Sequence, residues 1–141
     1  MFFMIKYFRK EGENVINIAI CEDNARILTS LKEMVNKLVK EEHNVFPFLN
    51  GNDLLNRIEN FQEATIDIVI TDIEMPLMDG HRLTKLIKDD DETKDIPVVI
   101  FSSLVNEEMR RKGEALGANA QLSKPEIGNL VREVDKLVLD K

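Results

Sequence analysis

The chain has 141 residues, of which 43% are apolar and 32% charged, and its formal net charge at pH 7 is −7. This length suits one domain with a hydrophobic core, and the acidic balance argues against nucleic acid as a direct partner, because phosphate binding needs a basic surface. The single cysteine, Cys21, excludes an internal disulfide and fits a cytoplasmic location. No apolar run approaches the roughly 20 residues that span a bilayer, so we expect no membrane insertion.

The first 14 residues differ in composition from the rest of the chain. They contain four aromatic residues together with Lys6, Arg9 and Lys10, so they are locally basic on an acidic protein. A signal peptide carries its positive charges before its apolar stretch, and here the order is reversed. We expect residues 1–14 to be a linker or a packing element, followed by one domain over residues 15–141.

Strand-like and helix-like segments alternate along that domain. In chain order the predicted elements are strand Ile16–Cys21, helix Ala25–Lys40, strand Val45–Leu49, helix Asn52–Phe61, strand Ile66–Thr71, helix His81–Lys88, strand Val98–Ser102, helix Glu107–Leu116, strand Ala120–Ser123 and helix Glu126–Leu139. Asn106 is placed to cap the fourth helix and Gly117 to end it.

This alternation predicts the fold class. The first, third and fourth strands are almost continuously apolar, which is typical of parallel strands buried on both faces. Five strand–helix repeats predict a doubly wound α/β fold, a (βα)5 sandwich with a parallel five-stranded sheet between two layers of helices. Ligands of such folds bind at the carboxyl ends of the strands, so the residues that end the strands are the candidates for function.

Acidic, hydroxyl and basic side chains follow the predicted strands. Glu22 and Asp23 come after the first strand, Asp72 ends the third, Ser102 ends the fourth and Lys124 follows the fifth. A lone aspartate after a strand is more often a turn or capping residue than a functional one. The five together predict that three carboxylates, a hydroxyl and an ammonium group meet at one edge of the sheet.

Such a group of side chains suits phosphoryl transfer to an aspartate. Neighbouring carboxylates repel one another, and a divalent cation relieves that repulsion. Mg²⁺ prefers oxygen ligands and needs only one or two carboxylates besides water and phosphate. Phosphoryl transfer needs a nucleophile in line and cations on the phosphoryl oxygens. Asp72 is the candidate nucleophile, Mg²⁺ and Lys124 are the cations, and Ser102 can donate a hydrogen bond.

The same residues resemble the receiver domain of two-component response regulators. The resemblance runs from about Val15 to Lys141 and rests on the acidic pair Glu22-Asp23, on Asp72 with the following Met-Pro-Leu-Met-Asp-Gly segment, on Ser102 and on Lys124-Pro125. It implies the CheY-like strand order 2-1-3-4-5. The segments Phe101–Leu104, Asn106–Met109 and Gly117–Pro125 look like the receiver half of the chemotaxis coupling protein family CheV.

The resemblance implies a role for each site residue. Asp23 would bind Mg²⁺ directly, Glu22 directly or through water, and Glu74 through its backbone carbonyl. Asp72 would bind the metal and accept a phosphoryl group from a histidine kinase, after which Ser102 and Lys124 would move inward and change the binding of a downstream chemotaxis or signalling protein. The domain would then be a signalling module rather than an enzyme, and a monomer or weak dimer. The Lys124–Pro125 bond is expected to be cis.

Two positions depart from the common pattern of the family. Gln121 stands where many receivers have an aromatic residue that moves together with the hydroxyl group at the position of Ser102. In this chain, Gln121 would be coupled to Ser102 by hydrogen bonds or not at all. Glu74 stands where many receivers have asparagine or another residue, at the mouth of the pocket.

Two other functions stay open. An Mg²⁺-dependent phosphohydrolase of the haloacid dehalogenase type also uses an aspartate after a parallel strand, but it needs a second aspartate where Glu74 stands. A degenerate receiver would keep the fold and bind partners without phosphorylation. A flavin carrier is disfavoured, because acidic residues follow the first strand where such proteins have a phosphate-binding loop. Outside the site, Cys21 is expected in the core, and His43 and His81 are expected to be exposed structural residues.

Overall fold

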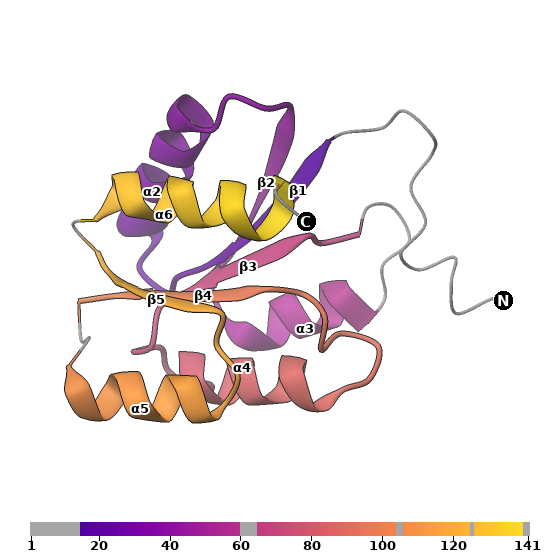
Figure 1. Cartoon of the computed structure of the whole chain (residues 1–141), viewed down its shortest axis with the longest axis vertical. Coiled ribbons are helices and arrows are strands. Elements are labelled where there is room, and N and C mark those ends of the chain that lie inside the picture. The colour runs from indigo at the N-terminus through magenta and orange to yellow at the C-terminus, as the bar shows by residue number, and fades with distance from the viewer. Residues whose placement is uncertain (1–14, 60–64, 104–105, 125, 140–141) are drawn as a thin grey trace, which may run out of the picture.

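The computed structural model describes residues 15–59, 65–103, 106–124 and 126–139. In chain order the elements are β1 (Ile16–Cys21), α2 (Ala25–Leu38), β2 (His43–Phe48), α3 (Gly51–Glu59), β3 (Ile68–Thr71), α4 (Gly80–Asp89), β4 (Val98–Ser102), α5 (Glu107–Ala115), β5 (Ala120–Ser123), α6 (Ile127–Val134) and the π-helical turn η1 (Asp135–Leu139). Figure 1 shows the strands as one twisted central layer with helices on both sides.

The five strands form a parallel sheet in the order β2-β1-β3-β4-β5. β1 is paired on both edges, with His43 opposite Ile16 on one side and Ile68 opposite Ile18 on the other. The predicted fold class and strand order are therefore confirmed. β2 lies at an edge of the sheet, where Pro47 is tolerated because an edge strand needs no N–H donor on its outer side.

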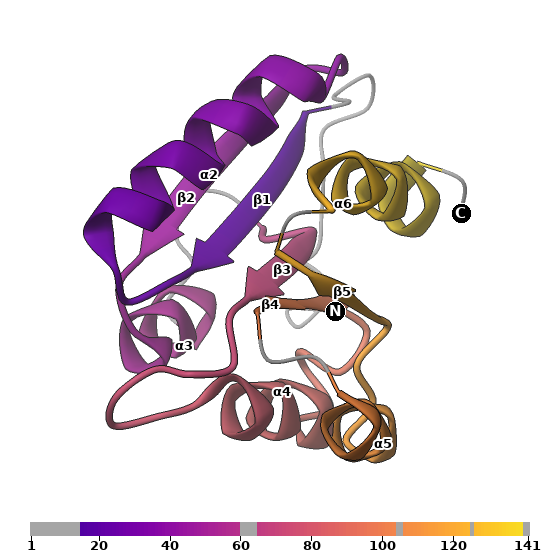
Figure 2. The same cartoon turned by 90° about the vertical axis from the view of Figure 1, so that its left-hand side faces the viewer.

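Alternate residues of the strands enter two separate cores. Ile18 and Ile20 of β1 face one core, whereas Ala19 and Cys21 face the other. Figure 2 shows α2 and α6 on one face of the sheet and α3, α4 and α5 on the opposite face. The first core is closed by Leu28, Leu31 and Val35 of α2 with Leu130 and Val134 of α6, and the second by Leu54 and Ile58 of α3 with Leu83 and Ile87 of α4.

The predicted limits of β3 and β2 differ from the observed ones. β3 begins two residues later than predicted, because the Asp67 carboxylate accepts the Asn17 N–H at 2.7 Å and so takes a backbone donor of β1. β2 begins two residues earlier than predicted, because its pairing with β1 starts at His43. The caps of α5 are confirmed: the Asn106 side chain accepts from the Met109 N–H at 2.8 Å, and Gly117 has a φ of 96°.

Some expectations lie outside the described residues. These are the character of residues 1–14 and the cis bond before Pro125. Within the described ranges, no helix is long and apolar enough to cross a membrane.

Candidate functional site

The candidate site lies at the carboxyl ends of β1 and β3, which are neighbours in the sheet. The Glu22 N–H donates to the Phe48 carbonyl at 3.0 Å, and the Asp72 N–H donates to the Cys21 carbonyl at 3.1 Å. Sheet pairing thus continues for one residue beyond β1 and β3. The backbones at Glu22 and Asp72 are therefore held by the same kind of hydrogen bond as the strands.

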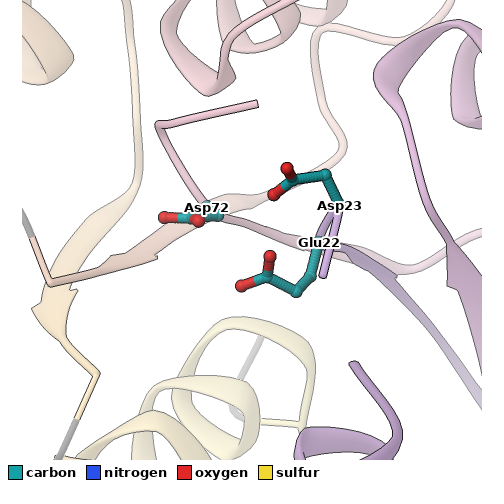
Figure 3. A group of neighbouring side chains, drawn as sticks. All are labelled: Glu22, Asp23 and Asp72. Carbon is teal, nitrogen blue, oxygen red and sulfur yellow. The ribbon is translucent and has the colours of Figure 1, made fainter. Parts of the chain in front are cut away.

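Three carboxylates meet there, as predicted. Glu22, Asp23 and Asp72 each offer a carboxylate oxygen, and these oxygens lie within 4.8 Å of one another. Figure 3 shows Glu22 and Asp23 turning their carboxylates toward the side of Asp72. Glu22 and Asp72 are buried, with 2% and 8% of their surface exposed, whereas Asp23 is exposed. The chain thus holds three acids together at the cost of their mutual repulsion.

Lys124 supplies the positive charge beside this acidic cluster. Its Nζ donates to Glu22 Oε1 and, at 3.2 Å, to Asp72 Oδ2. Burial alone would lower the pKa of Lys124, but its hydrogen bonds and charge contacts with Glu22 and Asp72 outweigh burial and raise that pKa above the ordinary value. The Lys124 ammonium is therefore charged at neutral pH and neutralises one of the three acids.

The Asp72 carboxylate has a defined orientation. Its Oδ1 accepts the Ile73 N–H at 2.8 Å, while its Oδ2 faces Lys124. The loop beyond is closed by the Gly80 N–H, which donates to the Ile73 carbonyl at 2.9 Å. A Cβ at Gly80 would lie only 1.9 Å from the Asp72 carbonyl oxygen, so the helix start can approach the acceptor backbone only with glycine there. The sequence motif contains Gly80, but its packing role follows only from the structure.

Ser102 and Glu74 occupy different surroundings at the same end of the sheet. Ser102 is 1% exposed, and its carbonyl accepts the Lys124 N–H at 3.2 Å, which links the ends of β4 and β5. Glu74 is exposed, and its carboxylate is not part of the acidic cluster found among the described residues. It lines an open pocket with Asp23, Ile73, Met75, Pro76, Asp79 and Met109.

The side chain of Gln121, on β5, is hydrogen-bonded to α5. Its side-chain Nε2 donates to the Arg110 carbonyl at 2.8 Å, and the Arg110 guanidinium donates to the Gln121 carbonyl at 3.2 Å. Gly113 allows this contact, since a Cβ there would lie 2.3 Å from Gln121 Oε1. Hydrogen bonds therefore connect β5 to α5 at position 121, where this chain has glutamine instead of an aromatic residue.

The expectation for His81 was wrong. Its side chain is 2% exposed and packed at the start of α4, with Nε2 buried and without a hydrogen-bond partner among the described residues. Burial, followed by the nearby charge of Lys112, lowers the pKa of His81 below its usual 6.5. His43, by contrast, is half-buried and bonds to Glu41 and Asn36. Cys21 is buried in the core, as predicted, against Met75.

Comparison with known proteins agrees with this geometry. The profile of the family described as response regulator receiver domain matches residues 18–135. The chain is 35% identical over 97 residues to the gliding motility regulatory protein of Myxococcus xanthus, covering 67% of this chain and 12% of that protein. It is 34% identical over 113 residues to chemotaxis protein CheV2 of Helicobacter pylori, covering 78% of this chain and 34% of that protein.

The chain thus spans about a third or less of the length of these two relatives. Among solved structures, the Mn²⁺-bound form of response regulator Rcp1 superposes with a TM-score of 0.73 at 21% identity, covering 86% of this chain and 92% of that chain. That likeness concerns the fold alone. Together with the sheet order and the acidic strand ends, the family match shows that this chain belongs to the response regulator receiver domains of two-component signalling.

Proposed function

We propose that this receiver domain is phosphorylated on Asp72 by a histidine kinase in the presence of Mg²⁺, and that the phosphoryl group switches its binding to a chemotaxis protein. The observation that carries the proposal is the placement of the buried Asp72 carboxylate between a charged ammonium group and two further acids. Family membership supports it, since receiver domains are signalling domains.

The acidic cluster fits a divalent cation. Three carboxylates with oxygens within 4.8 Å of one another, and one lysine as counter-charge, leave an excess of negative charge on oxygen ligands. Glu22, Asp23 and Asp72 would hold Mg²⁺, with the Glu74 carbonyl as a further ligand. Bound there, the ion would neutralise negative charge on the transferring phosphoryl group. The Mn²⁺-bound state of the structural neighbour Rcp1 is consistent with this assignment.

The chain's own residues would then carry the transfer. An Asp72 carboxylate oxygen attacks phosphorus, the P–N bond to the donor imidazole breaks, and its electron pair leaves with that imidazole. The Ile73 N–H holds the carboxylate in orientation, and Lys124 Nζ, already 3.2 Å from Asp72 Oδ2, attracts the incoming phosphoryl oxygens. Ser102, at the end of β4, would donate a hydrogen bond to one of those oxygens.

The switch would follow from a change in charge at Asp72. Phosphorylation adds about 1.5–2 negative charges, so the contacts of Lys124 and Ser102 rearrange around the new group. Because Ser102 ends β4 and Lys124 directly follows β5, that rearrangement would alter the surface next to α5, to which Gln121 is hydrogen-bonded. The similarity to CheV2 supports a partner in chemotaxis. We further propose a cytoplasmic location, no nucleic-acid partner and a monomeric or weakly dimeric domain.

The domain would comprise residues 15–141, with residues 1–14 as a preceding linker or packing element. The site does not support the phosphohydrolase alternative. That class of enzyme requires a second aspartate at position 74, and the Glu74 carboxylate lies outside the acidic cluster of the described residues. A degenerate receiver would be expected to lose a member of the site, and here Glu22, Asp23, Asp72, Ser102 and Lys124 are all present.

The proposal is tested with acetyl phosphate, a small phosphodonor that needs no kinase. The full chain is incubated with acetyl phosphate and Mg²⁺ and its intact mass is measured, with Asp72→Asn as the matched variant. We expect the wild-type chain to gain one phosphoryl group, the variant none, and EDTA to suppress the gain. Equal gain by both proteins, or none by the wild type, would contradict the proposal.

A further inference from the structure

Leu77, in the loop between β3 and α4, combines two unusual properties. It is 93% exposed, whereas the other exposed large hydrophobic residues in the described part of the chain lie between 40% and 48%. Its φ is 68°, in the left-handed region that glycine or asparagine adopts far more readily than leucine. A single exposed leucine is ordinary on a protein surface. A leucine that is both exposed and held in a strained backbone conformation calls for an explanation.

The strain comes from a tight turn that the surrounding structure holds in place. The Met78 N–H donates to the Pro76 carbonyl at 2.7 Å, which makes Leu77 the centre of a three-residue γ-turn with positive φ, the rarer and more strained kind. Beyond the turn, Met78 packs against Gly51 of α3, where a Cβ would lie only 2.8 Å from the Met78 sulfur. Met78 is thus held against α3, while the Leu77 side chain is exposed. Such local strain is commonly found at functional positions.

The position of the turn relates it to the acceptor. Figure 2 shows the loop between β3 and α4 projecting from the body of the domain beside α3. Pro76, directly before Leu77, and Asp79, two residues after it, both line the pocket that also contains Asp23 and Glu74. Asp72 is only 8% exposed, and Glu22 and Lys124 occupy one side of its carboxylate. The loop that carries Leu77 thus borders the pocket beside the acidic cluster, and we call the lining of that pocket the rim. A protein that covers the rim while it brings a phosphoryl group to Asp72 can contact Leu77, whereas a small molecule need not.

We infer that Leu77 is a specificity-determining contact for the protein phosphodonor and plays no part in the chemistry at Asp72. This inference rests on the proposed phosphorylation of Asp72. The rim carries the acidic side chains of Asp23, Glu74 and Asp79, and Pro76 and Met109 add apolar surface. The complementary surface on the donor is an apolar patch bordered by lysine or arginine, beside the phosphohistidine.

The test compares two donors on matched variants of the full chain. Leu77→Asn removes the apolar side chain and tolerates positive φ, so the turn persists. Leu77→Met keeps an apolar side chain, and Leu38→Gln removes a leucine that is 42% exposed at the last residue of α2, the end away from the site. The donors are acetyl phosphate and the radiolabelled phosphohistidine domain of the source organism's histidine kinase that labels the wild type fastest.

With the phosphohistidine domain, we expect Leu77→Asn to lower the second-order transfer rate constant about tenfold or more, as for loss of a buried apolar contact at an interface. Leu77→Met and Leu38→Gln should stay within about twofold of the wild type, the range of near-neutral surface changes. With acetyl phosphate, all four proteins should react alike.

Three results would overturn the inference: unchanged transfer to Leu77→Asn, equal losses with both donors, or a loss in Leu77→Met as large as in Leu77→Asn. Labelling by acetyl phosphate without labelling by any kinase domain would also overturn it while leaving the chemistry at Asp72 intact. Labelling of the wild type by neither donor would instead refute the proposed function itself.

Discussion

Neutralising Asp23 should make the metal-free protein more stable while removing its response to Mg²⁺. Asp23 is the exposed member of the acidic cluster, and its carboxylate lies within 4.8 Å of those of Glu22 and Asp72. The contacts of Lys124 are with those two buried acids. In the absence of metal, the Asp23 charge therefore adds repulsion near the site, and Asp23→Asn relieves it.

The size of the effect follows from the distance. Two unit charges 4.8 Å apart repel by about 1 kcal/mol in bulk water and by about 3.5 kcal/mol at an effective dielectric constant of about 20. Because Asp23 is exposed, the lower value applies, and it acts toward each of two neighbours. We expect Asp23→Asn to raise the free energy of unfolding by about 1–2 kcal/mol without metal.

The assay is urea unfolding followed by far-ultraviolet circular dichroism, since the chain has no tryptophan and only one tyrosine. It is run in EDTA and again at increasing Mg²⁺. At ten times its Kd, Mg²⁺ should stabilise the wild type by about 1.4 kcal/mol and leave Asp23→Asn nearly unchanged. Glu33→Gln, which neutralises an exposed acid of α2 outside the cluster, controls for the change in net charge.

If Asp23→Asn is no more stable than the wild type in EDTA, the repulsion between Asp23 and the two buried acids is absent. Equal stabilisation of the variant and the wild type by Mg²⁺ would contradict the role of Asp23 as a metal ligand. The same gain in stability from Glu33→Gln would show that the effect comes from net charge and not from the cluster.

The remaining predictions concern packing, pH and reactivity. Gly80→Ala places a methyl group 1.9 Å from the Asp72 carbonyl oxygen, so it should lower the free energy of unfolding by at least about 2 kcal/mol; an unchanged urea midpoint would contradict this. Burial and Lys112 lower the pKa of His81 below 6.5 in the folded state, so the unfolded chain binds more protons and stability from this group is lost as pH falls below about 6.5. Unfolding free energies from about pH 7 to pH 5 should therefore fall more steeply for the wild type than for His81→Gln, and parallel curves would refute this. Burial raises the pKa of the Cys21 thiol to about 12, so iodoacetamide near neutral pH should alkylate it only after unfolding in urea, and rapid alkylation of the folded protein would show that the thiol is accessible.

The sheet and the acidic cluster could be predicted because they depend on local patterns. Continuous apolar runs define β1 and β4 to the residue, since buried parallel strands have no polar face. The topology of such a sheet then brings Glu22, Asp72 and Lys124 to one edge, whatever the details of the loops.

What could not be predicted depends on contacts between distant residues. The late start of β3 results from a bond between Asp67 and Asn17, 50 residues apart. The spacing of His81 with Thr84 and Ile87 marks a buried face of α4, but a histidine alone does not reveal that α5 covers it. The turn at Leu77 was equally hidden, because leucine rarely adopts a positive φ.

The proposed function requires that Asp72 itself carries the phosphoryl group. After reaction with acetyl phosphate and Mg²⁺, borohydride reduces an aspartyl phosphate to homoserine, which peptide mass spectrometry locates in the sequence. We expect homoserine at position 72 of the wild type and no homoserine in Asp72→Asn. Homoserine at position 23 or elsewhere, or none despite the added phosphoryl mass, would contradict it.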